Sequence, residues 1–318
     1  MTPGPLRRLP VPVAPYPAET LHSFIARMAA ANHVDPVTLA KHLQTPAAPG
    51  SRPALDRIAA ASGRPKSNLR HALPELSGHH GRAHRERPRL ACRSCAAARG
   101  ILTPVTRWVA AHPNVCIRHH RWIGPTVRTI ADQHDLSVLP EILAAARHHR
   151  RLVRRHDVLH VRSAYNDAFR VNMQWAERRR FNHHRDRRLQ LLARPRCVAF
   201  NDPAMHAAMY PETVALASIM ITVHWVAAAA SPHKPDRNRF YTEVARRLDL
   251  PTYRTDGLGD ALATWAAHES RYALTELLQG PTTPKDATFI HCAPARSLNE
   301  HGASQLTADR PVPRSSES

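Results

Sequence analysis

The sequence predicts a mainly α-helical protein with three parts: an N-terminal helical part containing a helix-turn-helix, a small cysteine-containing module, and a C-terminal helical domain. In most segments apolar residues recur three and four positions apart, as on one face of a helix, and no long segment alternates apolar and polar residues as a half-buried strand does. The composition agrees, because 43% hydrophobic residues in 318 can supply a core, while 28 prolines predict irregular segments between the folded parts.

The N-terminal part is predicted to follow an extended, proline-punctuated arm at residues 1–17 and to cover residues 18–76. The apolar positions of its first helix follow the helical period: Leu21, Phe24, Ile25, Met28 and Ala29. Asp35 and Pro36 suit the N-cap and first turn of a second, short helix. Its expected apolar face comprises Val37, Leu39, Ala40 and Leu43.

The segment LDRIAAASGRPKSNLRHALPEL, which begins at Leu55, predicts a helix, a tight turn and a second helix. Ala59 allows close helix packing, and Gly63 tolerates the positive φ that the turn needs. In a DNA-binding helix-turn-helix, residues near the start of the second helix contact the groove. The candidate nucleic-acid-binding residues are therefore Arg64, Lys66, Ser67, Asn68 and Arg70. A helical hairpin with a solvated basic face explains the same pattern.

After an expected basic linker at residues 77–90, four potential metal ligands lie in a module at residues 91–125. Cys92, Cys95, Cys116 and His119 form a C-x2-C-x20-C-x2-H pattern, which suits a structural Zn2+ in a zinc-finger module. Three thiolates and an imidazole leave no open coordination position, so we expect a structural metal and no catalysis at it. His120 is an alternative fourth ligand, and the competing readings are unliganded thiols or a redox pair.

The C-terminal domain is expected to be helical over residues 126–279 and to be followed by a disordered tail at residues 280–318. Its runs HHRRLVRR and ERRRFNHHRDRR are solvated faces or phosphate contacts. The uncharged run Thr213–Ala230 is predicted to be a buried core helix and not a membrane span. Two long helices are expected between Leu139 and Arg180. The apolar face of the second is predicted to include Tyr165, Phe169, Met173 and Ala176.

The net charge of +20 predicts a polyanionic partner, and nucleic acid is the expected one, with a membrane surface as the competitor. Lys occurs only at positions 41, 66, 234 and 285, so 41 of the 45 basic residues are arginine. Prolines interrupt the apolar positions of the first residues, so we expect no secretory signal and a cytoplasmic location. The sequence contains no G-x-S-x-G, Walker, G-x-G-x-x-G or H-E-x-x-H motif, which argues against an enzyme.

The segment LPVPVAPYPAETLHSFIAR, from Leu9 to Arg27, is followed about seventy residues later by the cysteine pair, Trp108 and the Cys-x-x-His pair. Together these motifs resemble the TniQ family of transposition-associated proteins. The resemblance implies a non-catalytic adaptor that binds DNA or a guide complex during target-site selection and recruits an AAA+ ATPase and a transposase. It also implies that the metal ligands are Cys92, Cys95, Cys116 and His119. Ile117 and His120 stand where the family often has Pro and Gly.

A stand-alone DNA-binding transcriptional regulator built on the same domain is the alternative function. The expected partners are DNA and, through the resemblance, the ATPase and transposase. No membrane partner is expected, and a homodimer is compatible with the pattern.

Overall fold

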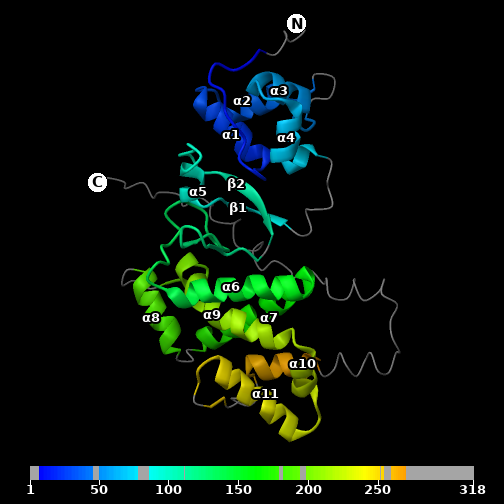
Figure 1. Ribbon diagram of the computed structural model, residues 1–318, viewed down its shortest axis with the longest axis vertical. Helices are drawn as coiled ribbons and strands as arrows, with labels where there is room; N and C mark the ends of the chain where they lie inside the picture. The colour runs from blue at the N-terminus through cyan, green and yellow to red at the C-terminus, as the bar shows by residue number, and fades with distance from the viewer. Residues whose placement is uncertain are drawn as a thin grey trace, which may run out of the picture. The chain divides into compact units, whose positions relative to one another are not determined.

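The computed structural model describes residues 7–45, 50–77, 86–110, 112–178, 182–193, 198–250, 252–253 and 259–269. Over these residues the chain is mainly helical and contains two small antiparallel sheets (Figure 1). The predicted fold class is therefore confirmed: helices make up most of the structure, and a small β region holds the four predicted metal ligands. The expected tail at residues 280–318 lies outside the described residues, as do Cys197 and Cys292.

The N-terminal helices form around one apolar core. They are α1 (Leu21–Ala31), α2 (Pro36–His42), α3 (Leu55–Ser62) and α4 (Lys66–Ala72), followed by the 3-10 turn η1 (Pro74–Leu76). All five predicted apolar residues of α1 are buried in this core, which also contains Leu69 and Leu73 from the α4 region. Gly63 ends α3 with a φ of 64°, so the predicted helix, turn and helix follow one another in the expected order.

The predicted apolar face of α2 is correct for Leu39 and Leu43 and wrong for Val37. The Asp35 carboxylate accepts a hydrogen bond from the Thr38 backbone N–H at 2.7 Å and caps the helix as expected. Leu39 and Leu43 are buried, whereas Val37 is 60% exposed. Val37 lies two positions before Leu39, which places it on the opposite side of this two-turn helix.

The β region surrounds the cysteine cluster. Strand β1 (Glu86–Leu90) pairs antiparallel with β2 (Thr106–Ala110), and the short helix α5 (Arg93–Ala97) lies between them in the chain. A second two-stranded sheet joins β3 (Val115–Cys116) to β4 (Arg121–Trp122).

The expected linker at residues 77–90 is therefore partly wrong, because residues 86–90 form strand β1. The sequence of this strand, ERPRL, shows no alternation of apolar and polar residues. Its strand conformation comes from nonlocal pairing with β2, in which Pro88 lies opposite Trp108.

The C-terminal region packs around the apolar helix α9. Its helices are α6 (Pro140–Arg155), α7 (Val158–Glu177), α8 (His183–Leu192), α9 (Pro203–Met220), α10 (Val223–Ala230) and α11 (Lys234–Arg247), and residues 261–269 are also helical. Helix α9 contacts α6, α7 and α8 (Figure 1) and is buried nearly all round, as its apolar composition requires.

The run Thr213–Ala230 does not form one buried helix. Helix α9 begins earlier, at Pro203, and ends at Met220, after which the chain turns by 81° into α10. Only Ala229 of α10 is buried. Among the described helices, no single one is long and apolar enough to cross a membrane; the bent pair of α9 and α10 meets the length and composition requirement only when taken together.

The buried face of α7 also differs from the predicted one. Tyr165, Phe169, Met173 and Ala176 are only partly buried. The residues buried on this helix are Val161, Ala164, Ala168, Val171, Asn172 and Trp175. The predicted positions each lie one residue after a buried one (Ala164, Ala168, Asn172 and Trp175), so the buried face is rotated by about 100° from the predicted one.

Candidate metal centre and nucleic-acid surface

The β region brings the four predicted metal ligands together. Cys92 follows β1, Cys95 lies in α5, Cys116 ends β3, and His119 lies in the turn before β4. The three sulfur atoms and one ring nitrogen all lie within 4.8 Å of one another. The His119 Nδ1 atom is 3.7 Å from Cys92 Sγ, 3.2 Å from Cys95 Sγ and 3.6 Å from Cys116 Sγ.

These separations fit a single metal ion. Ligands around a tetrahedral zinc with bonds of about 2.3 Å lie roughly 3.8 Å apart. The separation of Cys95 Sγ and Cys116 Sγ is 3.7 Å, and the other measured distances are equal or slightly shorter. The cluster could therefore hold a metal ion in the closed, four-ligand arrangement that the sequence pattern predicts.

The structure also distinguishes the two candidate histidines. His119 contributes its Nδ1 atom to the cluster, whereas His120 does not belong to it. His120 has a φ of 47°, and its carbonyl oxygen accepts a hydrogen bond from the Leu136 backbone N–H at 2.7 Å. This left-handed conformation favours glycine, although histidine occupies the position in this chain.

The clustered thiols perturb one another's protonation. A hydrogen bond with Cys116 lowers the pKa of the Cys92 thiol to about 5, and the same hydrogen bond raises the pKa of Cys116. Burial raises the pKa of Cys95. One thiolate therefore forms readily, while its negative charge opposes ionisation of the other two, and a bound cation would favour all three thiolates.

A buried glutamine, Gln133, positions the first ligand and was not predicted from the sequence. Its side-chain N–H group donates to the Ala91 carbonyl at 2.8 Å, and its side-chain oxygen accepts from the Arg93 backbone N–H at 2.8 Å. The two bonded residues lie on either side of Cys92. No local sequence signal identifies Gln133, because it lies 40 residues from Arg93 and only the fold brings them together.

The N-terminal motif forms a buried polar network centred on Glu19, whose side chain is fully buried. One carboxylate oxygen of Glu19 accepts hydrogen bonds from the Arg27 guanidinium at 2.7 Å and the Tyr16 backbone N–H at 2.8 Å. The other oxygen accepts from the Ser23 hydroxyl at 2.9 Å. The Thr20 hydroxyl caps α1 by accepting from the Ser23 backbone N–H.

This network connects α1 to β2 of the metal-binding region. The Thr20 backbone N–H donates to the Thr106 carbonyl at 2.9 Å, and the Thr106 backbone N–H donates to the Ser23 hydroxyl at 3.0 Å. The Trp108 backbone N–H donates to the Ala18 carbonyl at 2.8 Å. The N-terminal helices and the metal-binding region are therefore joined through motif residues, which have a structural role here.

The five candidate nucleic-acid-binding residues lie at the turn between α3 and α4 and on α4 itself. Lys66, Ser67, Asn68 and Arg70 are exposed, and Arg64 is half-buried. The Lys66 ammonium group is 2.7 Å from the Asp56 carboxylate, and both side chains are largely exposed. Exposed ion pairs of this kind are weak and leave the lysine available to a phosphate. None of the five residues belongs to the metal cluster.

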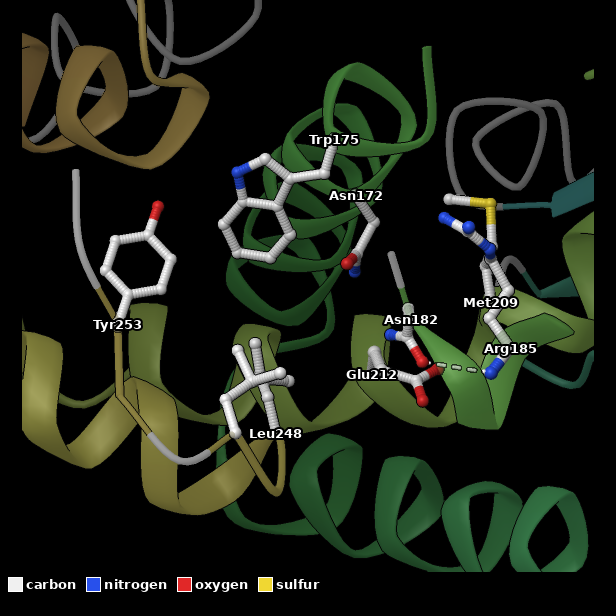
Figure 2. Close-up of a pocket in the computed structure, with 9 residues that line it drawn as sticks. Asn172, Trp175, Asn182, Arg185, Met209, Glu212, Leu248 and Tyr253 are labelled. Carbon is white, nitrogen blue, oxygen red and sulfur yellow. Dashed lines mark hydrogen bonds between the residues drawn. The ribbon is translucent and has the colours of Figure 1, made fainter. Parts of the chain in front are cut away.

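A small hollow in the C-terminal region has a structural explanation. Figure 2 shows Asn172, Trp175, Glu212 and Tyr253 around this space, which has a volume of about 50 Å³. The Glu212 carboxylate accepts a hydrogen bond from the buried Arg188 guanidinium at 2.6 Å. This buried ion pair joins α8 to α9, and the remaining space is enough for only a few water molecules.

A mainly helical fold contains a small β region with a Cys3His cluster, and a buried glutamate network joins this region to the N-terminal helices, which defines a candidate metal-binding module. Residues 10–122, about a third of the chain, match the TniQ family, so this chain carries a TniQ family domain. A TniQ domain implies a role in selecting targets for transposition, and TniQ family proteins are non-catalytic adaptors. No curated protein and no solved structure matches the chain.

Proposed function

We propose that this protein is a zinc-stapled, DNA-binding adaptor that selects target sites for transposition and links DNA or a targeting complex to an AAA+ ATPase and a transposase. The observation that carries the proposal is the Cys3His cluster within residues 10–122, the same residues that match the TniQ family. The adaptor would act by positioning partners, because the cluster offers no open coordination position for a substrate.

Zinc is the metal that the ligand set favours. Three cysteine sulfurs and one imidazole nitrogen are typical of structural zinc sites, and their spacing along the chain gives two short knuckles. The ion would hold β1, α5 and the β3–β4 turn together, in a region that has few buried apolar residues of its own.

The charge and the α4 surface support DNA as the partner. The net charge of +20 attracts a polyanion at long range. The exposed side chains of Lys66, Asn68 and Arg70 combine positive charge with an amide that can hydrogen-bond to a base edge. The α3–α4 pair would then act as the helix-turn-helix of the protein.

The test of DNA binding is a salt titration of duplex binding by the wild-type protein and Arg70→Ala. We expect Arg70→Ala to weaken binding. The slope of the logarithm of the binding constant against the logarithm of the salt concentration (the salt slope) should fall by about one, because one phosphate contact is lost. The matched control is Arg239→Ala on α11, where the guanidinium is 70% exposed and pairs with Asp236. An unchanged slope for Arg70→Ala would place the DNA surface outside α4.

The adaptor role is tested by co-expressing the protein with an AAA+ ATPase and a transposase of the same organism and purifying any complex. We expect a DNA-dependent complex that retains the ATPase. Sequence-specific binding to DNA without retention of either partner would instead support the transcriptional regulator.

A further inference from the structure

A second basic site lies between strand β1 and the helices α6 and α7. It is a cavity of about 110 Å³, several times the space of about 10–15 Å³ that one water molecule needs. Arg87 and Arg89 reach it from β1, His149 from α6, and Arg162 and Tyr165 from α7. Two separate regions of the chain therefore supply its walls.

The chemistry of the walls favours an oxygen anion. Three of the lining residues are arginines, two are histidines and none is an aspartate or glutamate. Arginine stays protonated at all accessible pH values and presents a planar set of N–H donors that matches phosphate oxygens. The remaining walls include valines, which keep the local dielectric low and strengthen the attraction for an anion.

A network of hydrogen bonds holds the walls in place. The Arg89 guanidinium donates to the Asn114 side-chain oxygen at 2.8 Å, and the Asn114 side-chain N–H group donates to the Tyr165 hydroxyl at 3.3 Å. Asn114 is almost fully buried. The His149 ring stacks on the Tyr165 ring with centroids 4.9 Å apart. The Arg89 guanidinium, fixed in this way, loses little conformational entropy when a ligand binds.

The basic groups that line the cavity lower one another's pKa. Burial lowers the pKa of Arg89, and the charge of Arg87 lowers it further. Burial and the charges of Arg150 and Arg89 lower the pKa of His112, which also lines the cavity. The buried Nδ1 atom of His112 has no hydrogen-bond partner among the described residues. An anion in the cavity would stabilise all of these groups.

The outer face of α6 extends this basic region. Four exposed arginines follow the helical period on it: Arg147, Arg150, Arg151 and Arg154. Among the described ion pairs and side-chain hydrogen bonds, none involves any of the four. Since Arg150 acts on His112, this arginine face adjoins the cavity.

We propose that the cavity binds a phosphate group, held by Arg87 and Arg162, and that the α6 arginines contact flanking phosphates of the same DNA strand. The proposal rests on the proposed DNA-binding function for the source of the phosphate and deepens it, because it adds a second DNA contact that extends from residues 10–122 into the C-terminal helices. It joins strand β1 of the TniQ domain and the C-terminal helices in one binding site.

The test compares the full chain with the double variant Arg87→Ala/Arg162→Ala, using a 20-base-pair duplex, inorganic phosphate and a nucleoside triphosphate as separate probes. We expect the variant to bind duplex at least tenfold more weakly near 0.1 M salt and to lose about two units of salt slope. The matched control is Arg239→Ala/Arg246→Ala on α11, which removes the same charge from exposed side chains and should change duplex affinity less than twofold.

The remaining outcomes show whether the cavity binds phosphate at all and, if it does, whether that phosphate belongs to DNA or to a free compound. Unchanged duplex affinity with lost binding of inorganic phosphate or triphosphate would support the site and identify its ligand as a free phosphate compound. Unchanged affinity for all three probes would overturn the proposal. If the double variant melts early, Arg87→Ala alone gives the same test, because Arg87 is exposed at its strand.

Failure of this site and failure of the proposed function give different results. If Arg70→Ala weakens duplex binding and the double variant does not, the cavity proposal fails and the function stands. If the wild-type protein binds inorganic phosphate but no duplex at any salt concentration, the function fails and the phosphate site stands.

Discussion

The β region around the cysteine cluster and the C-terminal helical region are stabilised by different interactions. Near the cysteine cluster the described interactions are mainly polar: the four clustered potential metal ligands, the buried Glu19–Arg27 pair and the bridging side chain of Gln133. In the C-terminal region, α9 is buried among its neighbours and two large apolar clusters account for the packing. The β region therefore depends on a few specific polar groups, whereas the C-terminal region depends on apolar packing spread over many residues.

The largest expected effect is that of losing the metal. Cys95→Ser, or removal of the metal with a chelator, should unfold the β region, because binding of a structural zinc contributes about 10–16 kcal/mol and whole domains are stable by only about 5–15 kcal/mol. The measurement is thermal melting with limited proteolysis. The control is Cys197→Ser, a cysteine outside the C-x2-C-x20-C-x2-H pattern, which should leave the metal content unchanged.

A substitution in the C-terminal core tests the other side of the comparison between the two regions. Phe240→Ala removes a fully buried side chain from the C-terminal core and should lower the free energy of unfolding by about 3–5 kcal/mol without changing the metal content. If chelation destabilised the C-terminal core as much as the β region, the two regions would not differ in the way described.

The next largest effect is expected from breaking the buried ion pair of Glu19 and Arg27. Glu19→Ala leaves the Arg27 guanidinium buried without its carboxylate and should cost about 3–5 kcal/mol in a chemical denaturation experiment. Glu141→Ala, an exposed residue in the first turn of α6, is the control and should change stability by less than about 0.5 kcal/mol. Equal effects of the two variants would rule out a structural role for the N-terminal motif.

The smallest of these effects is expected at Gln133. Gln133→Ala leaves the Arg93 backbone N–H and the Ala91 carbonyl without their partner and should cost about 1–3 kcal/mol. Because these groups flank Cys92, the variant should also release metal to a chelator faster than wild type. Arg128→Ala on the preceding exposed turn is the control for this release rate. An unchanged rate would mean that Gln133 does not position the ligand.

The sequence predicts those features that depend on local spacing. The face of α1, the N-cap at Asp35, the left-handed Gly63 and the four clustered ligands were all predicted from residues close together in the chain. The distinction between His119 and His120 required the structure, because it depends on the contact of His120 with Leu136.

Features that depend on distant partners were not predictable. Strand β1 exists because β2 pairs with it, and the role of Gln133 depends on residues about 40 positions away. The buried face of α7 includes Ala164, Ala168 and Asn172, which carry little hydrophobic signal of their own. The arginine-lined cavity likewise combines residues from β1, α6 and α7 that no local pattern connects.

The most direct test of the proposed function is the metal content of the purified full-length protein, measured together with its salt-dependent binding to duplex DNA before and after metal removal. We predict one zinc per chain, binding that weakens steeply as salt rises, and loss of that binding once the metal is removed. A protein that contains no metal, or that binds DNA equally well at every salt concentration, would contradict a zinc-stapled DNA-binding adaptor.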